Sequence, residues 1–168
     1  LLFLEEVTRV SGFPARAAFF RDEPVMRSDP RRGEWHQFVL SDRRSGQWKG
    51  DTSSDEIVGH VYGLSIYHDL VAEQQDKKAI AATLGRIADH ILEHGYYLVD
   101  LDGRPTTWGI WAPHDLNGDL FRMGDRGLNS LEILALLRTT HHITGEVRFL
   151  QSYHELIATH GYALNVID

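Results

Sequence analysis

Two segments of this chain share one helical layout, and this internal repeat limits the possible folds more than any other feature. In each segment a capping-box pattern opens one helix, a second helix comes next, and the second helix ends at His-Gly-Tyr-x-Leu. The glycines of the two endings, Gly95 and Gly161, lie 66 positions apart (161 minus 95). Repeated helical hairpins are typical of a solenoid or a closed ring of hairpins.

The first helical pair is expected over residues 53–95. Ser53-Ser54-Asp55-Glu56 forms a capping box, in which a serine oxygen accepts a backbone N–H and the glutamate reaches back. Apolar residues surround most of the first helix, which indicates burial on more than one side. The next helix has a single apolar stripe, formed by Ile80, Leu84, Ile87 and Ile91. This order predicts an inner helix and then an outer helix.

The second pair is expected over residues 129–161, opened by a capping box at Asn129-Ser130-Leu131-Glu132 and broken at Thr144-Gly145. Between the pairs, residues 96–127 are expected to form a β-hairpin and a loop, with the hairpin turn at Asp102-Gly103. In the first pair, Gly59 and Gly63 are four positions apart and would let a neighbouring backbone approach closely.

Residues 1–50 are expected to be irregular or extended, apart from one short helix within residues 1–10. Extended pieces are expected around Phe19-Phe20, over 35–40 and over 47–49. The sequence therefore predicts one mainly α domain over residues 1–168, built from antiparallel helical hairpins as a partial α/α toroid. Short β-hairpins would lie at one rim. A closed ring needs more hairpins than the chain shows, so we expect self-association or a missing remainder of the ring.

The composition argues against nucleic acid and membranes as partners, but it does not determine the cellular compartment. Hydrophobic residues make up 42% of the chain and charged residues 24%, which fits a globular protein and argues against disorder. A net charge of -7 argues against a nucleic-acid partner, and no apolar run is long enough to span a membrane. The absence of cysteine suits the cytoplasm but does not exclude the periplasm. A periplasmic or secreted location is the expectation, although the chain shows no signal peptide.

Carboxylates gather where the rim is expected, and they are the candidate catalytic groups: Asp51, Asp55, Glu56 and Asp100. Glycosidic hydrolysis uses one carboxylic acid to protonate the leaving oxygen and one carboxylate to activate water or attack directly. Asp51 and Asp55 are the first choices. The alternative is that Glu56 only caps its helix and that Asp55 only opposes the helix dipole.

Aromatic and basic residues near the same rim are the candidate substrate-binding groups: Trp48, His60, Arg104, Trp108 and Trp111. Flat aromatic faces suit the apolar face of a sugar, and a histidine can carry a proton or donate a hydrogen bond. The tryptophans could equally belong to the core. The chain has ten histidines but no metal-ligand spacing, and no nucleotide-binding or serine-hydrolase motif, so neither a metal nor a cofactor is expected.

Three segments resemble uncharacterised bacterial proteins of the six-hairpin (α/α) toroid glycosidase-like superfamily: Trp48 to His60, His94 to Asp100 and Arg126 to Glu132. The resemblance implies a toroid of the kind found in glycoside hydrolases and polysaccharide lyases, acting on an oligo- or polysaccharide. It supplies no established catalytic residues, and fold alone does not fix function. A glycoside hydrolase is the leading expectation. The alternatives are a polysaccharide lyase of the same fold and a non-catalytic helical-repeat module that binds a glycan or a protein.

Overall fold

The computed structural model describes residues 2–21 and 35–167. About 56% of the chain is helical, and the strands form two small antiparallel sheets. The sequence-based prediction of a mainly α protein with short β-hairpins is therefore confirmed at this level. Residues 22–34, which belong to the segment expected to be irregular, lie outside the described residues.

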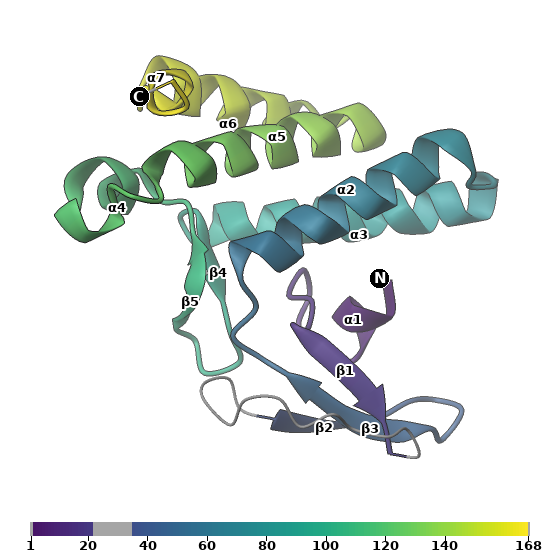
Figure 1. Ribbon diagram of the computed structural model, residues 1–168. Helices are drawn as coiled ribbons and strands as arrows, with labels where there is room; N and C mark the ends of the chain where they lie inside the picture. The colour runs from purple at the N-terminus through teal and green to yellow at the C-terminus, as the bar shows by residue number, and fades with distance from the viewer. Residues whose placement is uncertain (1, 22–34, 168) are drawn as a thin grey trace.

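The four longest helices of the described residues form two antiparallel pairs: α2 (Ser54–Leu70) with α3 (Gln74–Glu93), and α5 (Arg126–Thr144) with α6 (Val147–Ala158). In Figure 1, α2 and α5 run in the same direction, and α3 and α6 return. Hydrogen bonds near both ends of α2 and α5 agree with this parallel direction. Near the N-terminal ends Ser54 bonds to Glu132, and near the C-terminal ends Asp69 bonds to His142. Helix α5 packs against both α2 and α3, so the second pair lies against the first.

The N-terminal part forms a small sheet below the helices (Figure 1). It comprises α1 (Leu2–Glu6), β1 (Ala17–Phe20), β2 (Trp35–Val39) and β3 (Ser45–Lys49), with β3 between the other two strands. Both pairings are antiparallel. The extended pieces expected from the sequence are thus strands of one sheet.

The predicted β-hairpin between the helical pairs is present as β4 (Tyr97–Val99) and β5 (Pro105–Ile110). It is followed by α4 (Pro113–Gly118) and the 3-10 helix η1 (Leu120–Arg122). The repeated helix endings are found only in part. Gly95 directly follows the C-cap of α3, whereas α6 already ends at Ala158, three positions before Gly161. Both glycines have a positive φ, as glycine after a helix commonly does. The chain then enters β4 after Gly95, but α7 (Tyr162–Asn165) after Gly161.

One of the two expected capping boxes is wrong. At α2, the Glu56 carboxylate accepts the Ser53 backbone N–H at 2.7 Å, as predicted. Helix α5, however, begins at Arg126, so the residues expected to cap it lie inside the helix. There they bond elsewhere, because Asn129 donates to the Ile110 carbonyl at 2.9 Å and Glu132 accepts from Trp111 at 3.1 Å.

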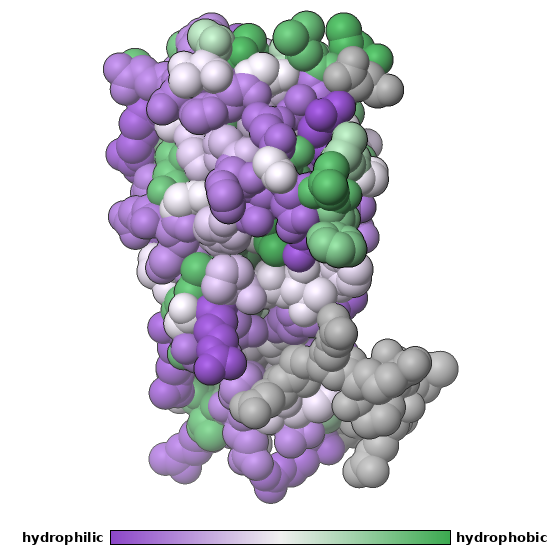
Figure 2. Space-filling view, turned by 90° about the vertical axis from the view of Figure 1, so that its left-hand side faces the viewer, coloured by the Kyte–Doolittle hydropathy of each residue, from purple (hydrophilic) through white to green (hydrophobic). Residues whose placement is uncertain are grey.

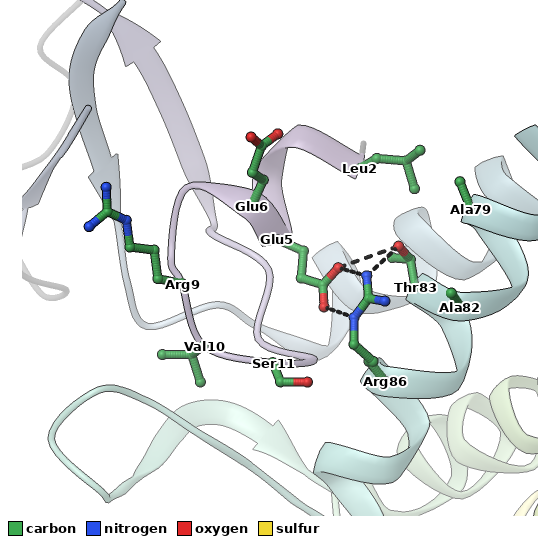
Figure 3. A pocket seen from close by; sticks show the side chains of 10 residues that line it. All are labelled: Leu2, Glu5, Glu6, Arg9, Val10, Ser11, Ala79, Ala82, Thr83 and Arg86. Carbon is green, nitrogen blue, oxygen red and sulfur yellow. Dashed lines mark hydrogen bonds and ion pairs between the residues drawn. The ribbon is translucent and has the colours of Figure 1, made fainter. Parts of the chain in front are cut away.

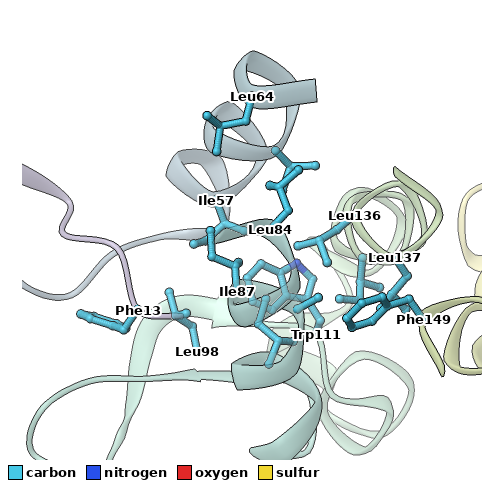
Figure 4. Packing of buried hydrophobic residues seen from close by; sticks show 14 of the residues in the cluster. Phe13, Ile57, Leu64, Leu84, Ile87, Leu98, Trp111, Leu136, Leu137 and Phe149 are labelled. Carbon is cyan, nitrogen blue, oxygen red and sulfur yellow. The ribbon is translucent and has the colours of Figure 1, made fainter. Parts of the chain in front are cut away.

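The hydrophobic core lies between the two helical pairs and extends to the small sheet. Figure 4 shows side chains from α2, α3, α5 and α6 meeting around Trp111. Fully buried members come from every one of these elements: Ile57, Leu84, Ile87, Leu137, Phe149 and Leu156. This shared core fixes the N-terminal halves of α2 and α5 beside the β4–β5 hairpin, where the predicted site residues lie.

Candidate functional site

Two predicted site residues, Asp51 and Asp100, meet where the chain passes from β3 to α2. The Asp100 carboxylate accepts the Asp51 backbone N–H at 2.7 Å, and the Asp51 carboxylate accepts the Thr107 backbone N–H at 2.7 Å. Asp51 therefore has a structural role that its sequence context did not reveal. It links the start of α2 to the β4–β5 hairpin.

The backbone around Asp51 is shaped for this contact. Asp51 has φ of 53°, an uncommon value for a residue with a side chain, although aspartate tolerates it better than most. A Cβ at Gly50 would lie 2.5 Å from an Asp100 carboxylate oxygen, so a larger residue there would displace the carboxylate that accepts the Asp51 N–H. Arg16 also donates to the Asp51 carbonyl at 3.2 Å. Asp51 and Asp100 thus hold a tight junction, in which each carboxylate accepts at least one backbone N–H.

Glu56 lies at the same junction and is also engaged. One carboxylate oxygen accepts from the Ser53 backbone and hydroxyl, and the other lies 3.5 Å from the Arg16 guanidinium. The structure therefore brings Asp51, Glu56 and Asp100 together, as expected. Each of these carboxylates, however, is held by hydrogen bonds or an ion pair that support the fold.

Asp55 differs from the other predicted acids. It is exposed on the first turn of α2, and within the described part of the chain its carboxylate makes no hydrogen bond or ion pair. The partial positive charge at the N-terminus of α2 favours a negative side chain there. Asp55 acts electrostatically on a second carboxyl, that of Glu132 on α5.

Glu132 was not among the predicted site residues, although it occupies the most unusual environment of any acid near the rim. Its side chain is only 8% exposed and accepts a hydrogen bond from the Trp111 indole at 3.1 Å and another from Ser54. Burial raises the pKa of Glu132, and the negative charges of Asp55 and Asp125 add to the effect. A signal was present, because Glu132 interrupts a run of leucines and isoleucines in a helix.

The three candidate tryptophans occupy different environments. Trp48 is 2% exposed and packs beside Phe13 and His36, and Trp111 is 1% exposed. Their ring faces are therefore not open to a sugar, although the Trp111 N–H reaches Glu132 directly. Trp108 is 49% exposed on β5 and remains available to a ligand.

The two polar candidates, His60 and Arg104, are not brought together. His60 is 4% exposed on α2, and burial lowers its pKa to about 4. Arg104 lies at the tip of the β4–β5 hairpin with an exposed side chain, 3.9 Å from Asp102. Neither residue makes a hydrogen bond to the Asp55–Glu132 pair within the described residues.

A separate cavity of about 570 Å³ lies between α1 and α3 (Figure 3). The ion pair of Glu5 and Arg86 lines it, with Arg86 Nε 2.6 Å from Glu5 Oε1. The Thr83 hydroxyl donates to the Glu5 carboxylate and accepts from the Arg86 guanidinium. Burial would raise the pKa of Glu5, but the hydrogen bonds from Arg86 and Gly12 outweigh it and lower the pKa. The two charges therefore neutralise each other, and this contact fastens α1 to α3.

Over residues 2–21 and 35–167, no group of three or more histidine or acidic side chains could hold a metal ion. No helix in the same ranges has the length and apolar character needed to cross a membrane. No protein-family model, curated protein or solved structure matches the chain. The candidate site is therefore described from the structure of this chain alone.

Proposed function

We propose that this chain is a carbohydrate-active domain that hydrolyses a glycosidic bond, with Glu132 as the general acid and Asp55 as its carboxylate partner. The observation that supports this most is the unequal environment of the two groups. Glu132 is buried with a raised pKa, whereas Asp55 is exposed at a helix N-terminus. Pairs of carboxyls whose environments separate their pKa values are the usual basis for assigning an acid and a base.

In this proposal each residue has a distinct step. Glu132 holds a proton and delivers it to the glycosidic oxygen as the bond breaks. Asp55 either removes a proton from the attacking water or attacks the sugar carbon directly. The Trp111 indole and the Ser54 hydroxyl fix the orientation of the Glu132 carboxyl. Asp51, Glu56 and Asp100 hold the junction that positions the first turn of α2.

Exposed apolar residues next to this pair would contact the substrate. Asp55, Val58 and Tyr62 are spaced three and four positions apart and so share one face of α2. On α5, Leu128 and Leu131 precede Glu132 and are 58% and 50% exposed. An aromatic ring and aliphatic side chains beside two carboxyls suit a sugar, whose rings have both C–H faces and hydroxyl edges.

A panel of neutral and acidic oligosaccharides tests the proposed function. Binding to the native state raises the melting temperature by mass action, so a true ligand is detected even when turnover is slow. We expect one sugar class to raise the melting temperature and to release reducing ends on incubation. Binding without new reducing ends would favour the non-catalytic glycan-binding module. Release of an unsaturated product would favour the lyase, and no shift with any sugar would contradict the proposal.

We also propose that α2 and α5 are neighbouring inner helices of an α/α toroid, completed by further hairpins or by a second copy of the chain. Their parallel direction supports this arrangement (Figure 1). The expected order of a buried first helix and an outer second helix is not found, because α3 packs against α5 as well as α2, and α2 leaves one apolar face exposed. Exposed apolar residues also occur along α2 at intervals of four positions: Val58, Tyr62, Ile66 and Leu70. A Cβ at Gly59 would meet nothing within 4 Å, so the neighbouring backbone expected there is not supplied by the described residues.

The end of the molecule that carries α4 lacks a continuous apolar stripe like the one on α2. Figure 2 shows this end as largely hydrophilic, with hydrophobic residues in separate patches. Exposed apolar residues of η1 and α7 lie outside the α2 stripe: Leu120, Phe121 and Leu164. Substitutions at these residues can therefore serve as controls for substitutions in the α2 stripe, which comprises Val58, Tyr62, Ile66 and Leu70.

Self-association through the α2 stripe predicts a concentration-dependent mass in solution. Tyr62→Glu should shift the protein to monomer, because a charge in an apolar contact is costly to bury. Sedimentation velocity measures the mass over a range of concentrations. Leu164→Glu is the matched control, since Leu164 is 65% exposed and Tyr62 is 69% exposed. A wild-type protein that stays monomeric at all concentrations would exclude a second copy of the chain, and further hairpins would then be the remaining way to cover the α2 stripe.

A further inference from the structure

A third carboxyl, that of Asp125, lies on the side of α5 that carries Glu132. Asp125 is the N-cap residue of this helix, and its backbone is already in the right-handed helical region. Glu132 follows seven positions later (132 minus 125), about two helical turns, so the two side chains share one side of the helix. On this side Asn129 donates to the Ile110 carbonyl at 2.9 Å, which directs it towards β5. The proposed reaction gives Asp125 no step of its own.

The first turn of α2 brings Asp55 to the same place. The Ser54 hydroxyl bonds to Glu132, and Asp55 is the next residue along the helix. Asp55 and Asp125 both act electrostatically on Glu132. Over residues 2–21 and 35–167, neither of these two carboxylates has a hydrogen bond or an ion pair. The proposed general acid therefore has two unpaired carboxylates as neighbours.

The cations around this site do not offset these charges. Helix α2 and strand β5 contain no lysine or arginine at all. Arg16 lies 3.5 Å from Glu56 and forms an ion pair with it. At the start of α5, Arg126 has a partner of its own, and Arg122 of η1 donates to the Thr107 carbonyl at 3.5 Å. Within the described part of the chain, the site therefore presents acidic groups to a substrate and no unengaged guanidinium.

We propose that this site takes neutral oligosaccharides and rejects acidic ones, with Asp125 as a specificity-determining residue. The inference rests on the proposed function, since it concerns the substrate of the same site. The hydroxyls of a neutral sugar can donate hydrogen bonds to the two unpaired carboxylates, and hydrogen bonds to an ionised acceptor are the stronger kind.

A uronic acid would meet the opposite situation. Its carboxylate would bring a further negative charge beside Asp55 and Asp125, and like charges repel more strongly where protein replaces water. A lyase acts on uronic acids and needs a cation to neutralise the uronate carboxylate. The shortage of free cations therefore also disfavours the lyase alternative at this site.

Matched substrates test the selectivity. Fragments of cellulose, mannan and starch are each assayed beside the counterpart in which C6 is oxidised to the uronic acid, by melting temperature and by release of reducing ends. We expect the neutral member of one pair to bind and to be hydrolysed, with kcat/KM about tenfold or more above that of its acidic counterpart. This ratio should shrink between about 0.01 M and 1 M sodium chloride, because the Debye length falls from about 30 Å to about 3 Å.

Asp125→Asn separates charge from shape, since asparagine has nearly the same size. The variant should reduce the neutral-to-acidic ratio about fivefold at low salt. An effect of the substitution on Glu132 would change both substrates alike and leave the ratio unaltered. Glu155→Gln is the control, because it changes the net charge equally and lies exposed on α6.

The outcomes distinguish this inference from the proposed function. Hydrolysis of both members of a pair at similar rates, or a ratio that neither salt nor Asp125→Asn alters, would overturn the selectivity and leave the hydrolase proposal standing. Binding of no sugar from either set would overturn both.

Discussion

Glu132→Gln is expected to reduce sugar hydrolysis about a thousandfold, because it removes the only proposed proton donor at the leaving oxygen. Glutamine has nearly the same shape and keeps an oxygen that can accept from Trp111. The fold should therefore persist. Turnover is measured on the oligosaccharide class that the binding panel identifies, and Asp55→Asn should produce a comparable loss.

The same variant has a predicted effect on stability that is independent of any substrate. Because the pKa of Glu132 is raised, the folded protein holds this proton more tightly than the unfolded chain does. Ionisation of Glu132 therefore costs stability once the pH exceeds the usual carboxyl pKa, and below it the cost disappears. Glu132→Gln should therefore be more stable than wild type at pH 8 and about equally stable at pH 4.

Urea unfolding at the two pH values, beside the activity assay, separates the possible explanations. Glu155→Gln is the control, because Glu155 is exposed on α6 and should change neither quantity. A variant that gains stability yet retains full turnover would exclude Glu132 as the acid without questioning its burial. A variant that loses stability at pH 8 would contradict the environment described for this carboxyl.

The helical pairs could be predicted from the sequence because local signals determine them. Capping residues, apolar periodicity and glycine at the helix ends all act within a few positions of the chain. The His-Gly-Tyr repeat predicted two equivalent endings; both glycines have a positive φ, but only Gly95 directly follows the C-cap of its helix, because α6 ends at Ala158. The element that follows each glycine depends on long-range contacts. The segment after Gly95 pairs with β5 as a strand. After Gly161, Tyr162 is buried and donates a hydrogen bond to the Trp111 carbonyl.

The candidate site was predicted less well, for the same reason. Sequence reasoning placed Asp51, Glu56 and Asp100 near one another but did not reveal how fully their oxygens are engaged, since their partners are up to 56 positions away. It treated Glu132 as a helix cap because the local pattern matched. The actual start of α5 lies earlier, at Arg126, and turns Glu132 into a buried side chain.

Acidification from pH 7.5 to pH 4 is expected to cost the protein about 3 kcal/mol of stability through His60 alone. Burial lowers the pKa of His60 to about 4, so the folded state resists a proton that the unfolded chain accepts near pH 6.5. Stability is therefore fully present above the unfolded pKa and falls as the pH drops towards 4. Burial also lowers the pKa of His90, which acts in the same direction.

Urea unfolding of wild type and His60→Leu at pH 7.5 and pH 4.5 measures this contribution. Leucine fills a similar volume without titrating, so the variant should lose much less stability on acidification than wild type. His154→Gln is the control, because His154 is exposed on α6. An equal loss in His60→Leu would show that His60 does not resist protonation.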